Sequence, residues 1–140
     1  MKYFAYGLNT NAEAMTRFPS AECCGTGILY GHELRFAHFP DVIQNIGSKV
    51  YGVLWNLDQE DANLLDMVQQ EKGFTLNNVI VMSNNKHHRV YTYKMVEGHP
   101  AQLPGGDYYA MIKQGYLTHN LNARQLHNAI NKIVNSINEL

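Results

Sequence analysis

The sequence predicts an α+β fold with a mixed sheet, because strand patterns come first, one helix pattern separates two groups of strands, and helix patterns end the chain. The strongest strand pattern covers residues 50–57, which are apolar almost throughout, as expected for a strand buried on both faces. A helix pattern follows directly, since Asp58 can cap the helix and the acidic Glu60 and Asp61 suit the positive end of its dipole.

The first part of the chain reads as strands joined by polar segments. Residues 3–7 predict a short buried strand, and residues 12–18 predict a short helix closed by Pro19. β-favouring and aromatic residues that approximately alternate with others predict extended structure over residues 25–39. The polar, glycine-containing residues 41–48 predict a connection to the strand that follows.

The second half of the chain predicts further strands and then helices. Near the end of the chain, apolar residues at helical spacing form a stripe that we expect to face the core, namely Leu126, Ile130, Ile133 and Ile137. The expected elements are a helix from Asp58 to near Gly73, strands over 79–82 and 90–95, a polar hairpin tip over 84–89, and helices over 108–115 and 122–140.

Length and charge restrict the class of protein. A chain of 140 residues has the size of one domain, so we expect a single domain over residues 1–140. Eleven Lys and Arg against twelve Asp and Glu give a formal net charge of −1, and no basic run offers a track for nucleic acid. No apolar stretch approaches the roughly 20 residues that cross a membrane, and no signal peptide is evident, so we expect a cytoplasmic protein. The sequence does not indicate an oligomeric state.

Cysteine and histidine usage argues against a disulfide and against a metal site. Cys23 and Cys24 are adjacent, and neighbouring cysteines rarely form a disulfide without strain, so we expect both to be reduced. The seven histidines show no tight ligand spacing joined to cysteines or carboxylates.

The turn after the first strand is a candidate binding loop. Residues 7–11, Gly-Leu-Asn-Thr-Asn, follow a strand, and backbone N–H groups at such a turn can hold a carboxylate or a developing oxyanion. The alternative interpretation is an ordinary junction between a strand and a loop, because glycine and asparagine are common in turns.

Several segments occur in a characteristic order along the chain. They are residues 3–9, 19–21 and 47–55, the pair Leu65-Asp66, and Pro104 with Tyr108, Ile112, Gly115 and His119. Together they resemble the gamma-glutamylcyclotransferase family, whose fold is also called AIG2-like. The resemblance implies a compact mixed β-barrel flanked by helices, a pocket at one barrel end, and no metal or organic cofactor.

The reaction implied by the resemblance is the closure of a lactam. The α-amino group of a γ-glutamyl amino acid or amine attacks its own side-chain carbonyl, which forms 5-oxoproline and releases an amine. Because the nucleophile belongs to the substrate, the enzyme supplies binding, oxyanion stabilisation and a group that moves protons. The expected partner is therefore a small γ-glutamyl substrate.

Matching positions give the candidate substrate-binding residues. Gly7, Leu8 and Asn9 match the family's binding loop, with Leu8 in place of the usual serine, so a backbone N–H remains while a hydroxyl contact is lost. Tyr6 is expected in the barrel core and at the pocket wall. Tyr108 matches the family's substrate-contacting tyrosine, and its alternative role is that of a core aromatic.

The position of the acid/base is open between two residues. The family's glutamate lies three residues after the Leu-Asp pair, which selects Gln69, and a glutamine cannot carry a proton near neutral pH. The run from Glu71 to Phe74 resembles a Glu-basic-Gly-aromatic run of some family members, which selects Glu71. In a regular helix Gln69 shares the face of Asp66 and Glu71 does not, so Glu71 requires an early helix end or a bulge.

Two functions follow from these two alignments. With Glu71 as acid/base the chain is a cyclotransferase, and this is the reading that we favour from the sequence. With Gln69 in the base position it is a catalytically inactive family member that binds a small ligand or takes part in protein interactions.

Overall fold

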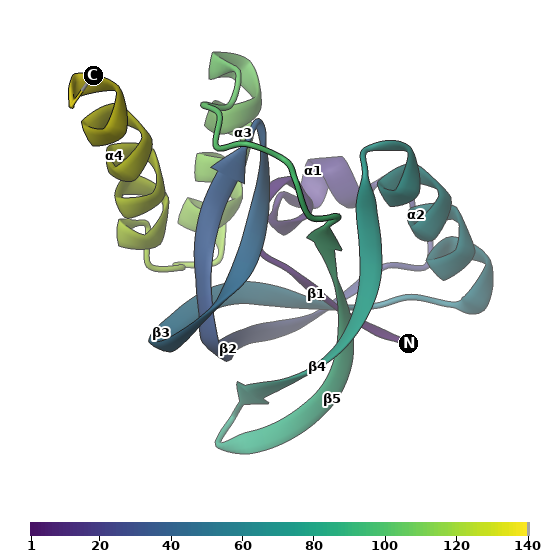
Figure 1. The fold of residues 1–140 in the computed structure, drawn as a ribbon. Coiled ribbons are helices and arrows are strands. Elements are labelled where there is room, and N and C mark those ends of the chain that lie inside the picture. Colours follow the sequence, from purple (N-terminus) through teal and green to yellow (C-terminus); the bar gives the residue numbers. More distant parts are fainter. Residues whose placement is uncertain (140) are drawn as a thin grey trace.

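Five strands close into a mixed barrel in the computed structural model, which describes residues 1–139 (Figure 1). Around the barrel the order is β1-β3-β2-β4-β5, and β5 pairs in parallel with β1 while the other neighbours are antiparallel. This confirms the expected compact mixed barrel. The strands are β1 (Lys2–Ala5), β2 (Glu22–Ala37), β3 (Phe39–Asn56), β4 (Phe74–Ser83) and β5 (Lys86–Met95).

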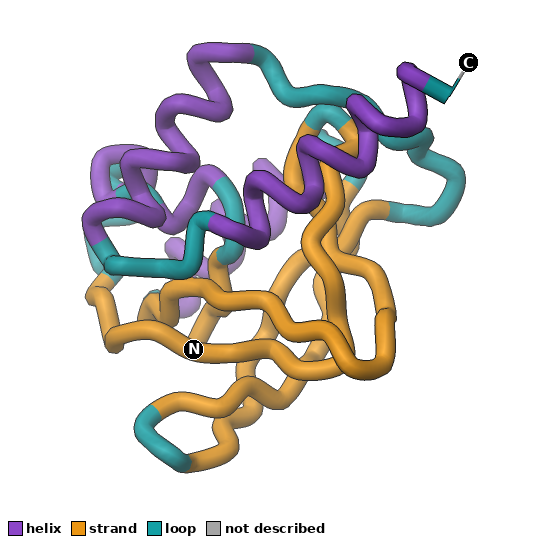
Figure 2. The backbone as a smooth tube through the Cα atoms, turned by 90° about the vertical axis from the view of Figure 1, so that its left-hand side faces the viewer, coloured by secondary structure: helices purple, strands orange, loops and turns teal. Residues whose placement is uncertain are grey.

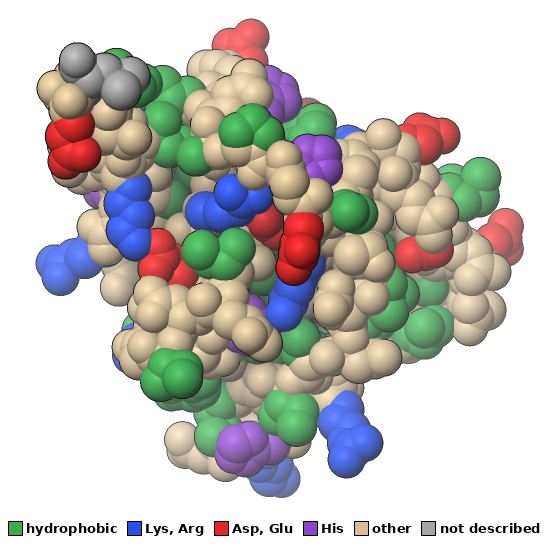
Figure 3. Space-filling view, in the orientation of Figure 1, with side chains coloured by type: hydrophobic (Ala, Val, Ile, Leu, Met, Phe, Trp, Pro, Cys, Tyr) green, Lys and Arg blue, Asp and Glu red, His purple; other side chains and the backbone are tan. Residues whose placement is uncertain are grey.

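The helices lie outside the barrel, and the tip of the β4–β5 hairpin projects away from them (Figures 1 and 2). Helix α4 packs against β2, and helix α2 packs against β4. Within the described residues, the helices are η1 (Leu8–Thr10), α1 (Ala12–Met15), α2 (Gln59–Glu71), α3 (Gly106–Thr118) and α4 (Arg124–Asn138). On the face drawn in Figure 3, acidic and basic side chains are interspersed.

Strand β1 is buried on both faces and joins two hydrophobic clusters. Tyr3 and Ala5 pack in the cluster that includes Trp55 and the residues under α2, whereas Phe4 and Tyr6 pack in the other cluster. This alternation is the period of two expected of a strand. Because β1 is apolar on both sides, it occupies the centre of the packed structure and fixes the start of the loop that follows.

Residues 41–48 form part of β3, so the prediction of a connection there is wrong. The chain turns at His38, which has a positive φ of 68°, and β2 and β3 pair from Ala37 with Phe39 onwards. Most of residues 43–48 are exposed, because this part of the hairpin extends beyond the packed core. Polar side chains on an exposed strand produce the same pattern as a loop, which explains the error.

Other differences concern the ends of elements. Turn residues Asn84 and Asn85, both with positive φ, connect β4 and β5, so the hairpin tip is shorter than expected. Ile137 is 55% exposed, whereas Leu126 is fully buried, so the apolar stripe of α4 faces the core only along its first part. Cys23 and Cys24 are free and exposed in β2.

Gly115 of α3 allows this helix to lie directly on the η1 turn. A Cβ atom at position 115 would lie 2.3 Å from Thr10 Oγ1 and 2.7 Å from the Asn11 nitrogen, well inside van der Waals contact. The same helix begins with Gly106, where a Cβ would meet nothing within 4 Å. A side chain is therefore excluded at position 115 and has space at position 106, so the two glycines can be compared within one helix.

We expect Gly115→Ala to destabilise the protein by about 1 to 3 kcal/mol, because the helix and the loop must move apart to admit the methyl group. Gly106→Ala is the control and should be neutral or stabilising by up to about 1 kcal/mol, since alanine favours a helix over glycine. Urea unfolding of the two variants measures the difference. Equal stabilities would contradict this account of the contact.

Candidate functional site

The loop over residues 7–11 turns tightly at the end of β1. The Gly7 carbonyl accepts hydrogen bonds from Thr10 N at 3.1 Å and from Thr10 Oγ1 at 2.7 Å, and Leu8 O accepts from Asn11 N at 2.9 Å. Within residues 1–139 the structure gives no hydrogen bond donated by the N–H groups of Leu8 or Asn9. These two groups are therefore available to a ligand.

Contacts from two elements, α3 and β3, hold this loop in place. Two of these contacts involve α3. The hydroxyl of Tyr116 in α3 donates to Tyr6 O at 2.5 Å, and Asn11 Nδ2 donates to the carbonyl of Met111 in α3 at 2.9 Å. The indole N–H of Trp55 in β3 donates to Asn9 O at 2.8 Å. The loop is thus fixed by the barrel on one side and by α3 on the other.

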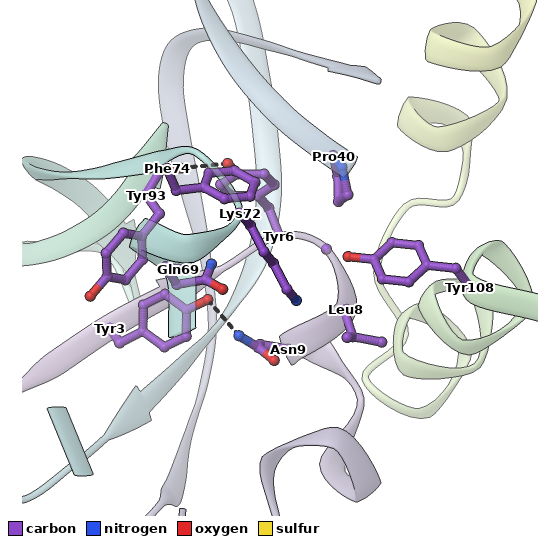
Figure 4. Close-up of a pocket in the computed structure, with 11 residues that line it drawn as sticks. Tyr3, Tyr6, Leu8, Asn9, Pro40, Gln69, Lys72, Phe74, Tyr93 and Tyr108 are labelled. Carbon is purple, nitrogen blue, oxygen red and sulfur yellow. Dashed lines mark hydrogen bonds between the residues drawn. The ribbon is translucent and has the colours of Figure 1, made fainter. Parts of the chain in front are cut away.

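A pocket opens beside this loop, at one end of the barrel (Figure 4). We call it the Gln69 pocket. Its empty space, including the part that is open to solvent, is about 370 Å³. The cavity volume is only about 30 Å³, which is the space of one or two water molecules. The enclosed part of the pocket is therefore small. The residues that line it are Tyr3, Tyr6, Gly7, Leu8, Asn9, Pro40, Gln69, Lys72, Phe74, Tyr93 and Tyr108.

The structure brings together six of the seven residues named from the sequence. Tyr6, Gly7, Leu8, Asn9, Gln69 and Tyr108 all line the pocket, and Glu71 does not. Glu71 is exposed at the end of α2, whereas Gln69 is 8% exposed and lies on the buried face of that helix. Helix α2 continues through Glu71 without the early end that would turn this carboxylate towards the loop.

Four tyrosines form much of the pocket wall, and burial keeps their phenols protonated. Burial raises the pKa of Tyr3 to about 12, and it also raises the pKa values of Tyr6, Tyr93 and Tyr108. Asn9 Nδ2 donates to the Tyr3 hydroxyl at 3.1 Å, and the Tyr6 hydroxyl donates to Tyr93 O at 2.5 Å. At neutral pH these phenols can hydrogen-bond to a ligand, but they cannot act as bases.

Lys72 supplies the one cationic side chain among the lining residues that the structure describes. It is partly buried, and its side chain extends into the space between Gln69, Asn9 and Tyr108 (Figure 4). Its Nζ lies 5.3 Å from the centre of the Phe39 ring. Burial, and to a smaller extent the charge of Arg17, lowers the pKa of this amine below its ordinary value of 10.5.

The pocket residues that the sequence did not predict are Lys72, Tyr3, Tyr93, Pro40 and Phe74. For Lys72, the one local signal that it could face the loop is its place at the end of the helix before Gly73. Tyr3 and Tyr93 come from strands that meet only in the closed barrel, so no spacing in the sequence connects them. Among residues 1–139, no three His, Cys, Asp or Glu side chains are grouped to hold a metal ion.

The family follows from this fold and from the sequence together. A family model described as "Gamma-glutamyl cyclotransferase, AIG2-like" matches residues 3–110, which is more than half of the chain. The protein therefore belongs to this family, which confirms the resemblance. Membership supports the cyclotransferase class of enzyme and a small γ-glutamyl compound as the kind of substrate.

Solved structures share the fold at low sequence identity. A structure titled "Gamma-glutamyl cyclotransferase" has a TM-score of 0.83 at 24% identity and covers 92% of this chain and 85% of that one. The human protein loc79017 has a TM-score of 0.82 at 24% identity, with 91% and 85% covered. YkqA from Bacillus subtilis has a TM-score of 0.78 at 19% identity, with 97% of this chain and 54% of that chain covered. A search of curated proteins found no match.

The described helices include none with the length and apolar character needed to cross a membrane.

We expect the protonated amine of Lys72 to lower the free energy of unfolding, because its charge is partly buried. Because its pKa is lower in the folded state than in the unfolded state, the cost is full below the folded pKa and disappears as pH rises towards 10.5. Lys72→Met should therefore raise the free energy of unfolding at pH 7, and the gain should shrink at pH 10.5. Urea titrations at both pH values measure it. Lys86→Met, at an exposed position, is the control, and an equal gain in that variant would contradict the expectation.

Proposed function

We propose that the protein binds a small γ-glutamyl compound, or the lactam derived from it, in the Gln69 pocket and does not cyclise it. The observation that carries the proposal is the place of Gln69. Gln69, the position that the Leu65-Asp66 pair selects for the acid/base, lines the pocket, while Glu71, the rival position, is exposed and does not line it.

Cyclisation needs a group that takes a proton from the substrate ammonium and returns one to the leaving amine. A carboxamide has no proton that titrates near neutral pH, and the phenols around it have raised pKa values. No Asp or Glu is among the eleven described residues that line the pocket. The residues present therefore supply no carboxylate for this step.

The binding functions of the pocket are retained. Leu8 N–H and Asn9 N–H have no partner among the described residues, and the amine of Lys72 and the hydroxyl of Tyr108 are further donors among the lining residues. Donors of this kind hold a carboxylate or a carbonyl oxygen. The Gln69 pocket is thus equipped to bind a polar ligand without transforming it.

A second candidate function is the cyclotransferase reaction itself, with 5-oxoproline as product and Lys72 as proton acceptor. One observation favours it, namely that burial and Arg17 lower the pKa of an amine that extends into the pocket. In this candidate the neutral amine of Lys72 takes the proton from the substrate ammonium and later delivers it to the leaving amine.

The deciding experiment restores the carboxylate. The wild-type protein and Gln69→Glu are incubated with a panel of γ-glutamyl amines, γ-glutamyl amino acids and glutathione, and 5-oxoproline is followed by mass spectrometry. We expect no product from the wild type. We expect Gln69→Glu to exceed the wild-type background by at least about 100-fold, which is the usual contribution of a positioned acid/base.

Two variants control for the added charge and for the exposed carboxylate. Gln59→Glu makes the same change at an exposed position of α2 and should give no product, and Glu71→Gln in the Gln69→Glu background should leave the rate unchanged. Product from the wild type would overturn the proposal. If Lys72→Met then formed no 5-oxoproline, the second candidate would be established.

A further inference from the structure

We infer that the Gln69 pocket selects carboxylate ligands that carry no protonated amine, with Lys72 as the group that pairs with the carboxylate. This inference rests on the proposed binding function and names the chemical class of the ligand. The amine of Lys72 forms no ion pair within residues 1–139, and no Asp or Glu lines the pocket with it. The described lining residues therefore carry one positive charge that a ligand can neutralise.

The carboxylates around the pocket lie outside its described lining. Arg17 donates from Nη2 to Asn9 Oδ1 at 3.0 Å, which places a second cation behind the binding loop. Of the nearby carboxylates, Asp41 pairs with Arg35, whose Nε lies 2.9 Å away. Asp66 accepts from the Tyr93 hydroxyl at 3.1 Å and has no cationic partner among the described residues, but it does not line the pocket. A ligand carboxylate is thus the free anion that Lys72 can meet in the pocket.

A free γ-glutamyl amide carries a carboxylate and an ammonium group on the same carbon atom. Lys72 attracts the first and repels the second, and a partly buried site screens this repulsion less than open solvent does. With a carboxamide at position 69, the pocket has no anion to offset that repulsion. An acid whose nitrogen is acylated, either in a lactam ring or as an N-acyl group, keeps the attraction and avoids the repulsion.

Gln69 complements such a ligand. Its side chain makes no hydrogen bond within residues 1–139 and lies beside Lys72 in the pocket wall (Figure 4). A carboxamide offers both a donor and an acceptor, and so does the amide of a lactam or of an N-acyl group. The cavity volume of about 30 Å³ further restricts the buried part of the ligand to one small group.

Three ring compounds of similar size test the inference by isothermal titration calorimetry. They are 5-oxoproline, which has a carboxylate and a neutral nitrogen, proline, which has a carboxylate and a protonated nitrogen, and 2-pyrrolidinone, which has no carboxylate. We expect 5-oxoproline to bind at least about tenfold more tightly than either of the others. Lys72→Met should remove this preference, while Lys86→Met should keep it.

A fourth compound separates failure of this inference from failure of the proposed function. If γ-glutamylmethylamide binds as tightly as 5-oxoproline, the pocket does bind γ-glutamyl compounds and the inferred selectivity is wrong. The selectivity is also wrong if Lys72→Met keeps the preference for 5-oxoproline. If none of the four compounds binds at millimolar concentration, the proposed binding function fails and this inference fails with it.

Discussion

Closure of the barrel by β1 is the constraint on which the pocket depends. This four-residue strand pairs with β3 along its length and with β5 at Tyr3 and Tyr91, and Thr92 Oγ1 donates to Phe4 O at 2.7 Å. Both faces of the strand are packed, so neither register nor orientation can change without exposing aromatic side chains. Because the binding loop follows within two residues, its place at the barrel end is set by the same contacts.

Much of the fold was predictable because its signals are local. The apolar run before Asp58, the cap that this residue forms with Asp61 N at 2.9 Å, and the apolar start of the chain each depend on neighbours in sequence. The outer part of the β2–β3 hairpin was not predictable in this way. Its strand is exposed, and there hydrogen bonding across the hairpin, rather than burial of a patterned face, makes the structure.

The part of the candidate site that lies in one continuous segment of sequence was predictable. The part that is assembled from several separate segments was not. The loop from Gly7 to Asn9 is continuous in the sequence, whereas Tyr3, Lys72 and Tyr93 come together only when the barrel closes and α2 packs against it. The choice between Gln69 and Glu71 depended on where the helix ends. Leu65 is fully buried, and Gln69 lies one turn further on the same face, so an unbroken helix puts Gln69 inside.

The close approach of Gly115 to Thr10 and Asn11 separates the parts of this molecule that can vary from those that cannot. At that joint the helix and the loop have no spare space, so a change in either one demands a change in the other. The side chains of Gln69 and Lys72, in contrast, end in the pocket and make no hydrogen bond or ion pair within the described residues. New ligand preferences can therefore be acquired, by evolution or by protein engineers, through replacements at these two positions while the framework stays the same.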